Sequence, residues 1–105
     1  EVLDQIHLAA AIDGVDFLFV GPSDLSQAMG HVGELSHEEV WAAIERTSAA
    51  CRAHGKTWGT IAVNPEFVQR ALENDCRMLI AGGDVLCLRR GIEATKEMFP
   101  EMFPD

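Results

Sequence analysis

Three short apolar runs, each followed by a turn and a helical pattern, constrain the fold more than any other feature of this sequence. The runs cover residues 15–20, 57–63 and 78–81, and a helical stripe over residues 2–12 precedes them. Continuous apolar runs of this length are typical of strands in parallel sheets, whose connections are helices. The sequence therefore predicts an α/β fold, with one helix and then three strand–helix units joined by right-handed crossovers.

Local signals predict where the longer helices begin and end. Ser36 as N-cap and Glu39 at the third helical position form a capping box for the helix between the first two strands. Asn64 is the N-cap of the next helix, and Pro65 is its first residue. The last helix is predicted over residues 85–99, where Pro100 stops it.

Length and charge narrow the class of protein. At 105 residues the chain is one domain or part of one, and 48% hydrophobic residues exclude a disordered chain. A formal net charge of −9 argues against binding to nucleic acid or to an anionic membrane surface. No apolar run approaches the roughly 20 residues of a membrane span, and no signal peptide is visible.

The cysteines and the first residue give two further expectations. Three cysteines, an odd number without C-x-x-C spacing, indicate a reduced, cytoplasmic setting. The chain begins with Glu1 inside a helical pattern, so we expect a fragment or a trimmed product.

The segment from Phe17 to Ser26 places polar groups at the end of the first strand. Its sequence, Phe-Leu-Phe-Val-Gly-Pro-Ser-Asp-Leu-Ser, runs from an apolar strand through a Gly-Pro turn into a helix. Asp24 could hold a cation there, and the backbone N–H groups of Ser23 and Asp24 could face an anion. An Asp after such a turn is also commonly a helix N-cap, so the residues alone leave both interpretations open.

The same segment carries a family resemblance. Residues 14–26 resemble the metal-binding segment of the HpcH/HpaI aldolases, which are metal-dependent class II pyruvate aldolases acting on 2-keto-3-deoxy acids and 2,4-dihydroxyheptenedioate. The likeness continues through shorter matches along nearly the whole chain: Gly55-Lys56, Gly59, Ala62-Val63, and Gly82 with Asp84.

The resemblance implies that the chain is the C-terminal portion of a (β/α)₈ TIM barrel. Residues 1–105 would be a single partial domain that supplies the last three βα units of a barrel needing about 250 residues. The family's second metal ligand, a Glu, would fall just before Glu1, and its catalytic Arg and His lie in the first half of the barrel. No catalytic residue is therefore expected within this chain, which alone should be inactive. None of the four histidines matches the family His, and we expect surface or capping roles for them.

The resemblance also assigns site residues. Asp24 falls on the metal-binding aspartate, and Mg²⁺ or Mn²⁺ is the expected cation, with Co²⁺ as an alternative. The expected substrate-binding residues are Gly21, Pro22, Ser23, Asp24 and Ile61. The implied reaction is a carbon–carbon lyase reaction that cleaves a 4-hydroxy-2-keto acid to pyruvate, or a close analogue, and an aldehyde through a metal-stabilised enolate.

Two other functions stay open at this point. The chain could be a noncatalytic association module, or a citrate-lyase-like enzyme that acts on a thioester, although it lacks a basic patch for a coenzyme A phosphate. The expected partners are a small 2-keto acid and further copies of the chain, because in the resembled family the final helix packs against a neighbouring subunit. Asp84, after the Gly82-Gly83 turn, is expected to be a structural N-cap.

Overall fold

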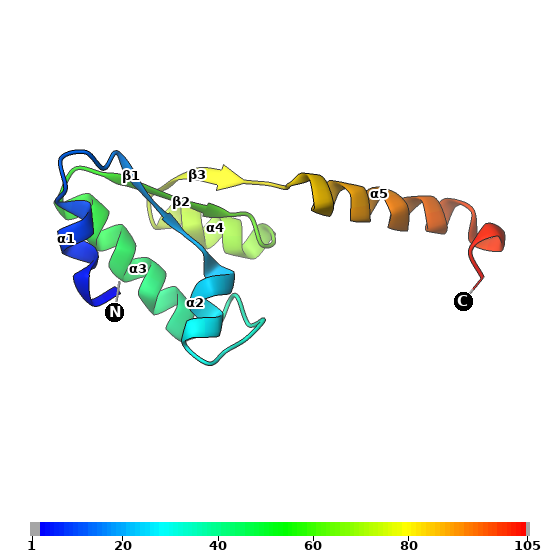
Figure 1. Cartoon of the computed structure of the whole chain (residues 1–105), viewed down its shortest axis with the longest axis horizontal. Coiled ribbons are helices and arrows are strands. Elements are labelled where there is room, and N and C mark those ends of the chain that lie inside the picture. Colours follow the sequence, from blue (N-terminus) through cyan, green and yellow to red (C-terminus); the bar gives the residue numbers. More distant parts are fainter. Residues whose placement is uncertain (1–2, 105) are drawn as a thin grey trace.

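The computed structural model describes residues 3–104 and has the predicted α/β architecture (Figure 1). Its three strands are β1 (Phe17–Val20), β2 (Thr57–Ile61) and β3 (Cys76–Ile80). Its α-helices are α1 (Ile6–Ala10), α2 (Pro22–Ala28), α3 (Glu38–Ala53), α4 (Pro65–Glu73) and α5 (Asp84–Met98). Short 3-10 helices lie near the two ends, η1 (Leu3–Gln5) and η2 (Pro100–Met102).

The strands form one parallel sheet in the order β1-β2-β3. Phe19 of β1 and Met78 of β3 both stand in register with Gly59, and the register of β2 with β3 shifts between Trp58 and Gly59. A Cβ atom at Gly59 would lie 2.8 Å from Met78 Cβ and 2.9 Å from Met78 O. The close approach of β2 and β3 therefore requires a residue without a side chain at this position.

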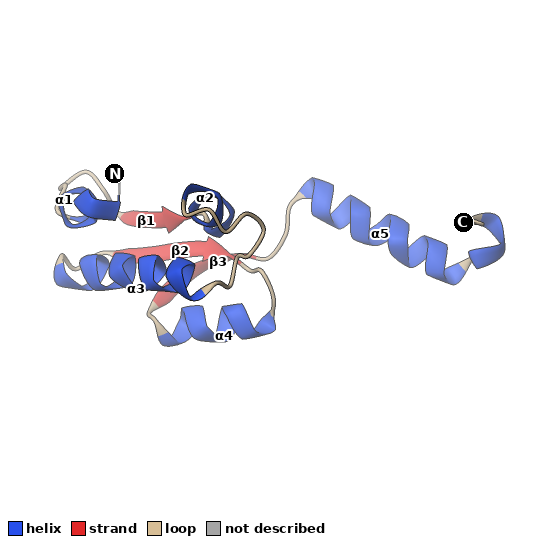
Figure 2. Ribbon diagram, turned by 90° about the horizontal axis from the view of Figure 1, so that it is seen from below, coloured by secondary structure: helices blue, strands red, loops and turns tan. Residues whose placement is uncertain are grey.

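The core lies between the sheet and the helices α3 and α4 (Figure 2). Trp41 of α3 and Phe67 of α4 are both buried, with ring centroids 4.6 Å apart. Trp58 of β2 is also buried, and its Nε1–H donates to the backbone oxygen of Asn74 at 2.7 Å. One face of α3 is buried and consists of Val40, Trp41, Ile44, Thr47, Ser48 and Cys51.

The predicted N-cap is correct for α4 and wrong for α3. Asn64 caps α4, because its Oδ1 accepts a hydrogen bond from the Phe67 N–H at 2.8 Å. Ser36 was predicted to cap α3, and this is wrong: His37 is the N-cap, and its Nδ1 accepts from the Glu39 N–H at 3.2 Å. The reason is a backbone turn from Glu34 to His37, closed by a 3.0 Å hydrogen bond, which holds Ser36 outside the helix.

The opposite face of the sheet carries large apolar side chains that are not covered. Phe17 and Phe19 of β1 are 42% and 45% exposed, and Met78 and Ile80 of β3 are 37% and 45% exposed. The alternating residues Leu18 and Val20 pack into the core instead. Because successive side chains of a strand point to opposite faces, the sheet has one packed face and one open apolar face.

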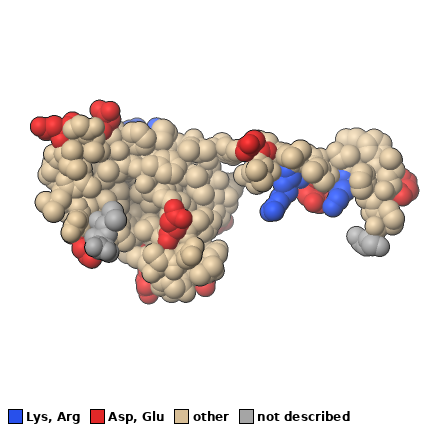
Figure 3. All heavy atoms as spheres, in the orientation of Figure 1, with Lys and Arg blue, Asp and Glu red and all other residues tan. Residues whose placement is uncertain are grey.

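Helix α5 extends away from the rest of the molecule (Figures 1 and 2). The Cα radius of gyration is 17.1 Å, whereas a compact domain of this length has about 13 Å. No residue of α5 is buried, and its exposed apolar side chains include Val85, Leu88 and Ile92. In the face shown in Figure 3, most of the visible Lys and Arg atoms also lie on this helix. Within residues 3–104, no helix is both long and apolar enough to cross a membrane.

Candidate functional site

Asp24 lies in the first turn of α2, directly after the end of β1. Gly21 is the N-cap and Pro22 the first helical residue, and no side chain caps this helix. The capping interpretation of Asp24 is therefore wrong. Among residues 3–104, no hydrogen bond or ion pair engages its carboxylate, and the side chain is exposed. The carboxylate oxygens of Asp24 are thus available to a ligand.

Gly21 and the Asp24 carboxylate are in close contact. A Cβ atom at Gly21 would lie 2.8 Å from Asp24 Oδ2, a distance that real Cβ contacts essentially never show. The backbone of Gly21 has φ −94° and ψ 98°, which any residue can adopt. Glycine is therefore needed at position 21 to leave space for the Asp24 carboxylate, and its backbone conformation does not require glycine.

Asp24 and Gly21 line a hollow of about 320 Å³ beside β1. Apolar residues of η1, α1, β1 and α2 form most of its wall: Leu3, Ile6, Ala9, Leu18, Phe19, Val20, Leu25 and Ala28. Asp24 is the one ionisable residue among those that line it. Mg²⁺ is commonly held by one or two carboxylates together with water and substrate oxygens, so this donor fits part of such a site.

The other predicted site residues lie around the same edge of the sheet. Pro22 is buried, whereas Ser23 is exposed, and the N–H groups of the first turn at Ser23 and Asp24 have no partner inside the helix. Ile61 ends the neighbouring strand β2, where Thr60 Oγ1 donates to the Val20 oxygen at 2.9 Å and ties the two strand ends together. Ile61 does not line the hollow that contains Asp24.

Asp84 follows β3 at the beginning of α5. The N-cap of α5 is Gly83, so the expectation that Asp84 is the N-cap is off by one residue. Asp84 Oδ1 accepts a hydrogen bond from the Val85 N–H at 2.8 Å, which satisfies a first-turn donor.

The shifted pKa values of three groups have structural causes. Burial raises the pKa of the Cys51 and Cys76 thiols, which keeps both protonated in the core. Hydrogen bonding to the Arg70 guanidinium lowers the pKa of the Glu38 carboxyl, with the charge of Arg70 as the second cause. Arg70 also pairs with Glu45 at 3.0 Å and lies over the Trp41 ring, 4.4 Å from its centroid. This cluster joins α3 to α4.

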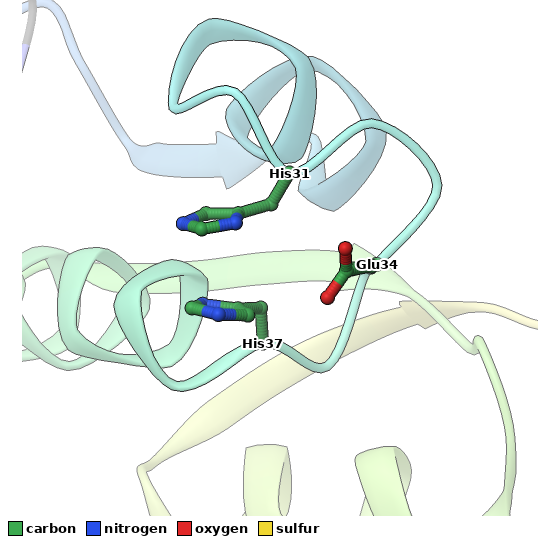
Figure 4. Close-up of side chains that lie close together, drawn as sticks. All are labelled: His31, Glu34 and His37. Atoms are coloured by element: carbon green, nitrogen blue, oxygen red, sulfur yellow. The ribbon is translucent and has the colours of Figure 1, made fainter.

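One group of side chains was not expected from the sequence. His31, Glu34 and His37 come together in the loop between α2 and α3 (Figure 4). The two imidazole rings stack with centroids 3.5 Å apart. For His37, the general expectation of a surface or capping role holds, because it is the N-cap of α3. The three-residue spacing of the group, with Gly30 and Gly33 between helices, is the signal in the sequence that could have found it.

Comparison with known proteins places these features in a family. Residues 1–90 match the family model described as HpcH/HpaI aldolase/citrate lyase. A 5-keto-4-deoxy-D-glucarate aldolase from Salmonella arizonae is 38% identical over 97 residues, which cover 92% of this chain and 38% of that protein. A hydroxypyruvate/pyruvate aldolase from Delftia acidovorans is 44% identical over 81 residues, which cover 77% of this chain and 30% of that protein.

A solved structure agrees with the sequence matches. An HpcH/HpaI aldolase/citrate lyase family protein from Burkholderia cenocepacia superposes with a TM-score of 0.79 at 33% identity, covering 97% of this chain and 38% of that chain. The chain thus spans less than half the length of the relatives it matches. The family model covers most of the chain, and the chain therefore belongs to the HpcH/HpaI aldolase/citrate lyase family.

Proposed function

We propose that this chain is the C-terminal part of a (β/α)₈ barrel in a metal-dependent aldolase. The relatives' names support an aldolase, which is a carbon–carbon lyase. The open face of the sheet supports the barrel, because the inward faces of barrel strands are apolar and are covered only when the barrel closes. Phe17, Phe19, Met78 and Ile80 would then fill the interior together with the side chains of the remaining strands.

The observation that carries the proposal is the free carboxylate of Asp24 at the carboxyl end of a parallel strand. Active sites of (β/α)₈ enzymes lie at this end of the strands. Asp24 has no protein partner within residues 3–104 and lines an apolar hollow, so its exposed carboxylate is accessible to a cation. Asp24 would supply one ligand to Mg²⁺ or Mn²⁺, and the remaining protein ligand would come from another part of the barrel.

The neighbouring groups would position the substrate. The N–H groups of Ser23 and Asp24 point from a helix N-terminus and would donate hydrogen bonds to the carboxylate of a 2-keto acid. Gly21 keeps space for the Asp24 carboxylate, and Ile61 would approach the substrate from the end of β2. When bound, the cation would supply positive charge to the oxygen on which negative charge develops as the carbon–carbon bond breaks.

Asp24→Asn in the proposed full-length enzyme tests this assignment. The amide keeps the size of the side chain and removes its charge, so Mn²⁺ affinity and kcat for cleavage of a 4-hydroxy-2-keto acid should both fall by at least about tenfold, with the fold retained. Asp16→Asn is the matched control, because Asp16 is exposed just before the opposite end of β1. Near-normal kcat of Asp24→Asn at ordinary Mn²⁺ concentrations would show that Asp24 is not the metal ligand.

A further inference from the structure

A group of three metal-ligating side chains lies outside the aldolase site, in the loop between α2 and α3. One nitrogen or oxygen atom each of His31, Glu34 and His37 lies within 4.8 Å of the other two. In the part of the chain that the structure describes, this is the one group of three or more His, Cys, Asp or Glu residues close enough to hold a metal. Figure 4 shows the two rings one above the other with the Glu34 carboxylate beside them.

The backbone of the loop explains why these residues meet. A hydrogen bond of 2.9 Å closes a turn from His31 to Glu34, and a second of 3.0 Å closes a turn from Glu34 to His37. The two turns have four residues each and share Glu34, and the first and last Cα atoms of such a turn lie within about 7 Å of each other. Gly33 makes the first turn possible, because its φ of +83° is unfavourable for residues with a side chain. The loop geometry is therefore set by the backbone, and the three side chains share one side of it.

We propose that His31, Glu34 and His37 form a binding site for a divalent transition-metal ion such as Zn²⁺, Co²⁺ or Ni²⁺. Two imidazoles and one carboxylate are ligands typical of these ions, whereas Mg²⁺ prefers oxygen ligands only. The site is separate from Asp24 and does not depend on the proposed aldolase function. It would fix the α2–α3 loop, and water or a small ligand would complete the coordination.

The second contact of His31 fits this role, whereas that of His37 would have to be given up. His31 Nε2 lies 3.1 Å from Glu39 Oε2, which leaves Nδ1 as the nitrogen for the metal. A ligating histidine commonly donates its other N–H to a carboxylate, which orients the ring. His37 Nδ1 accepts from the Glu39 N–H, so metal binding would take the place of this capping hydrogen bond. The chain's net charge of −9 favours the approach of a cation.

Metal binding requires a change in both the distances and the orientation of the rings. Ligands of a tetrahedral site with metal bonds of about 2.0–2.1 Å are about 3.3 Å apart. The three atoms therefore have to approach by about 1.5 Å at most from their separations of up to 4.8 Å. The two imidazole planes are also only 16° apart, so one ring has to rotate out of the stack before both nitrogen lone pairs can point at one ion. Glu34 is exposed and both histidines are half-buried, so these side-chain rotations do not require the core to move.

Titration of the 105-residue chain with Co²⁺ tests the proposal, with visible absorption as the readout and Zn²⁺ as the competitor. All variants carry Cys87→Ser, because Cys87 is exposed and its thiol could bind these ions. The parent should bind one Co²⁺, which Zn²⁺ displaces and excess Mg²⁺ does not. His31→Gln and His37→Asn should each weaken binding more than about 100-fold, since even loss of a residue that only orients a ligand costs about 10- to 100-fold.

The variants are chosen so that the fold is kept. Asn is a good N-cap and retains an acceptor for the Glu39 N–H, and Gln at position 31 can still donate to Glu39. The matched control is the double variant His7→Gln/His54→Gln, which removes a histidine pair with ring centroids 6.0 Å apart and should leave binding unchanged. A further measurement, paramagnetic broadening of the His31 and His37 imidazole signals by Co²⁺, needs no substitution.

Each of the following results would overturn the proposal: no saturable binding of one Co²⁺ by the parent, equal weakening by the His7→Gln/His54→Gln control, or binding that persists in His31→Gln and His37→Asn. If Asp24→Asn alone abolished binding, the ion would lie at the aldolase site and the loop site would be refuted. Failure of the loop site would leave the proposed function untouched, because the latter depends on Asp24.

Discussion

Replacing Gly21 with Ala should weaken metal binding at Asp24 without harming the fold. The added Cβ atom would lie 2.8 Å from Asp24 Oδ2, and an ordinary contact begins at 3.4 Å, so the carboxylate has to move by about 0.6 Å. Metal–ligand distances tolerate deviations of only about 0.2 Å. We therefore expect Mn²⁺ affinity to fall by at least about tenfold, as for other disturbances of ligand position.

The backbone angles of Gly21 predict how Gly21→Ala changes the free energy of unfolding. Because φ −94° and ψ 98° suit Ala, the free energy of unfolding should change by less than about 1 kcal/mol. Gly14→Ala is the control, since a Cβ atom there meets nothing within 4 Å. The assays are Mn²⁺ titration of the proposed full-length enzyme, followed by electron paramagnetic resonance, and urea unfolding of the same proteins.

The comparison with Asp24→Asn separates the possible failures. If Asp24→Asn lost Mn²⁺ binding and Gly21→Ala bound Mn²⁺ as tightly as the parent, the ligand assignment would stand and the steric argument would be refuted. If Gly21→Ala unfolded at a much lower urea concentration than Gly14→Ala, Gly21 would have a backbone role that its dihedral angles do not indicate.

Five further outcomes follow from the structure. The chain alone should release no pyruvate from a 4-hydroxy-2-keto acid, because it spans only about 38% of its aldolase relatives; metal-dependent release by the purified chain would contradict this. Gly59→Ala should lower the free energy of unfolding by about 1–3 kcal/mol relative to Gly14→Ala in urea titrations, because its Cβ would press on Met78 O. A thiol reagent should modify only Cys87 in the native chain. Since burial raises the folded-state pKa of Cys51 and Cys76, the stability that these thiols contribute is complete below about pH 8.5 and should be lost as pH rises above it, seen as a falling Tm. The exposed apolar side chains of α5 and the open sheet face predict that the chain forms oligomers or aggregates. The mass measured by sedimentation equilibrium at micromolar concentration should therefore exceed the monomer mass of 11.5 kDa.

The sequence by itself determined the order and type of the elements. Apolar runs that alternate with helical patterns predicted three strands and their helices. These patterns can be read from the sequence because a strand or helix that packs on a core has apolar residues at a regular spacing. The N-cap of α4 at Asn64 and the left-handed backbone of Gly55, with φ +64°, were also predictable. Both features depend only on residues nearby in the sequence. The position of Asp24 at a strand end followed from the same local pattern.

Tertiary structure decided the features that depend on contacts or on competition between neighbouring turns. The cap of α3 is His37 and not Ser36, because His37 Nδ1 accepts from the Glu39 N–H that the Ser36 side chain was predicted to bind. The turn from Glu34 to His37 leaves Ser36 outside the helix. The contact of Gly21 with the Asp24 carboxylate depends on the rotamer of the Asp24 side chain. The spacing of apolar residues in the sequence does not predict that rotamer. The open face of the sheet and the extended α5 have the same physical cause: apolar surfaces need partners, and residues 3–104 cover only one face of this sheet.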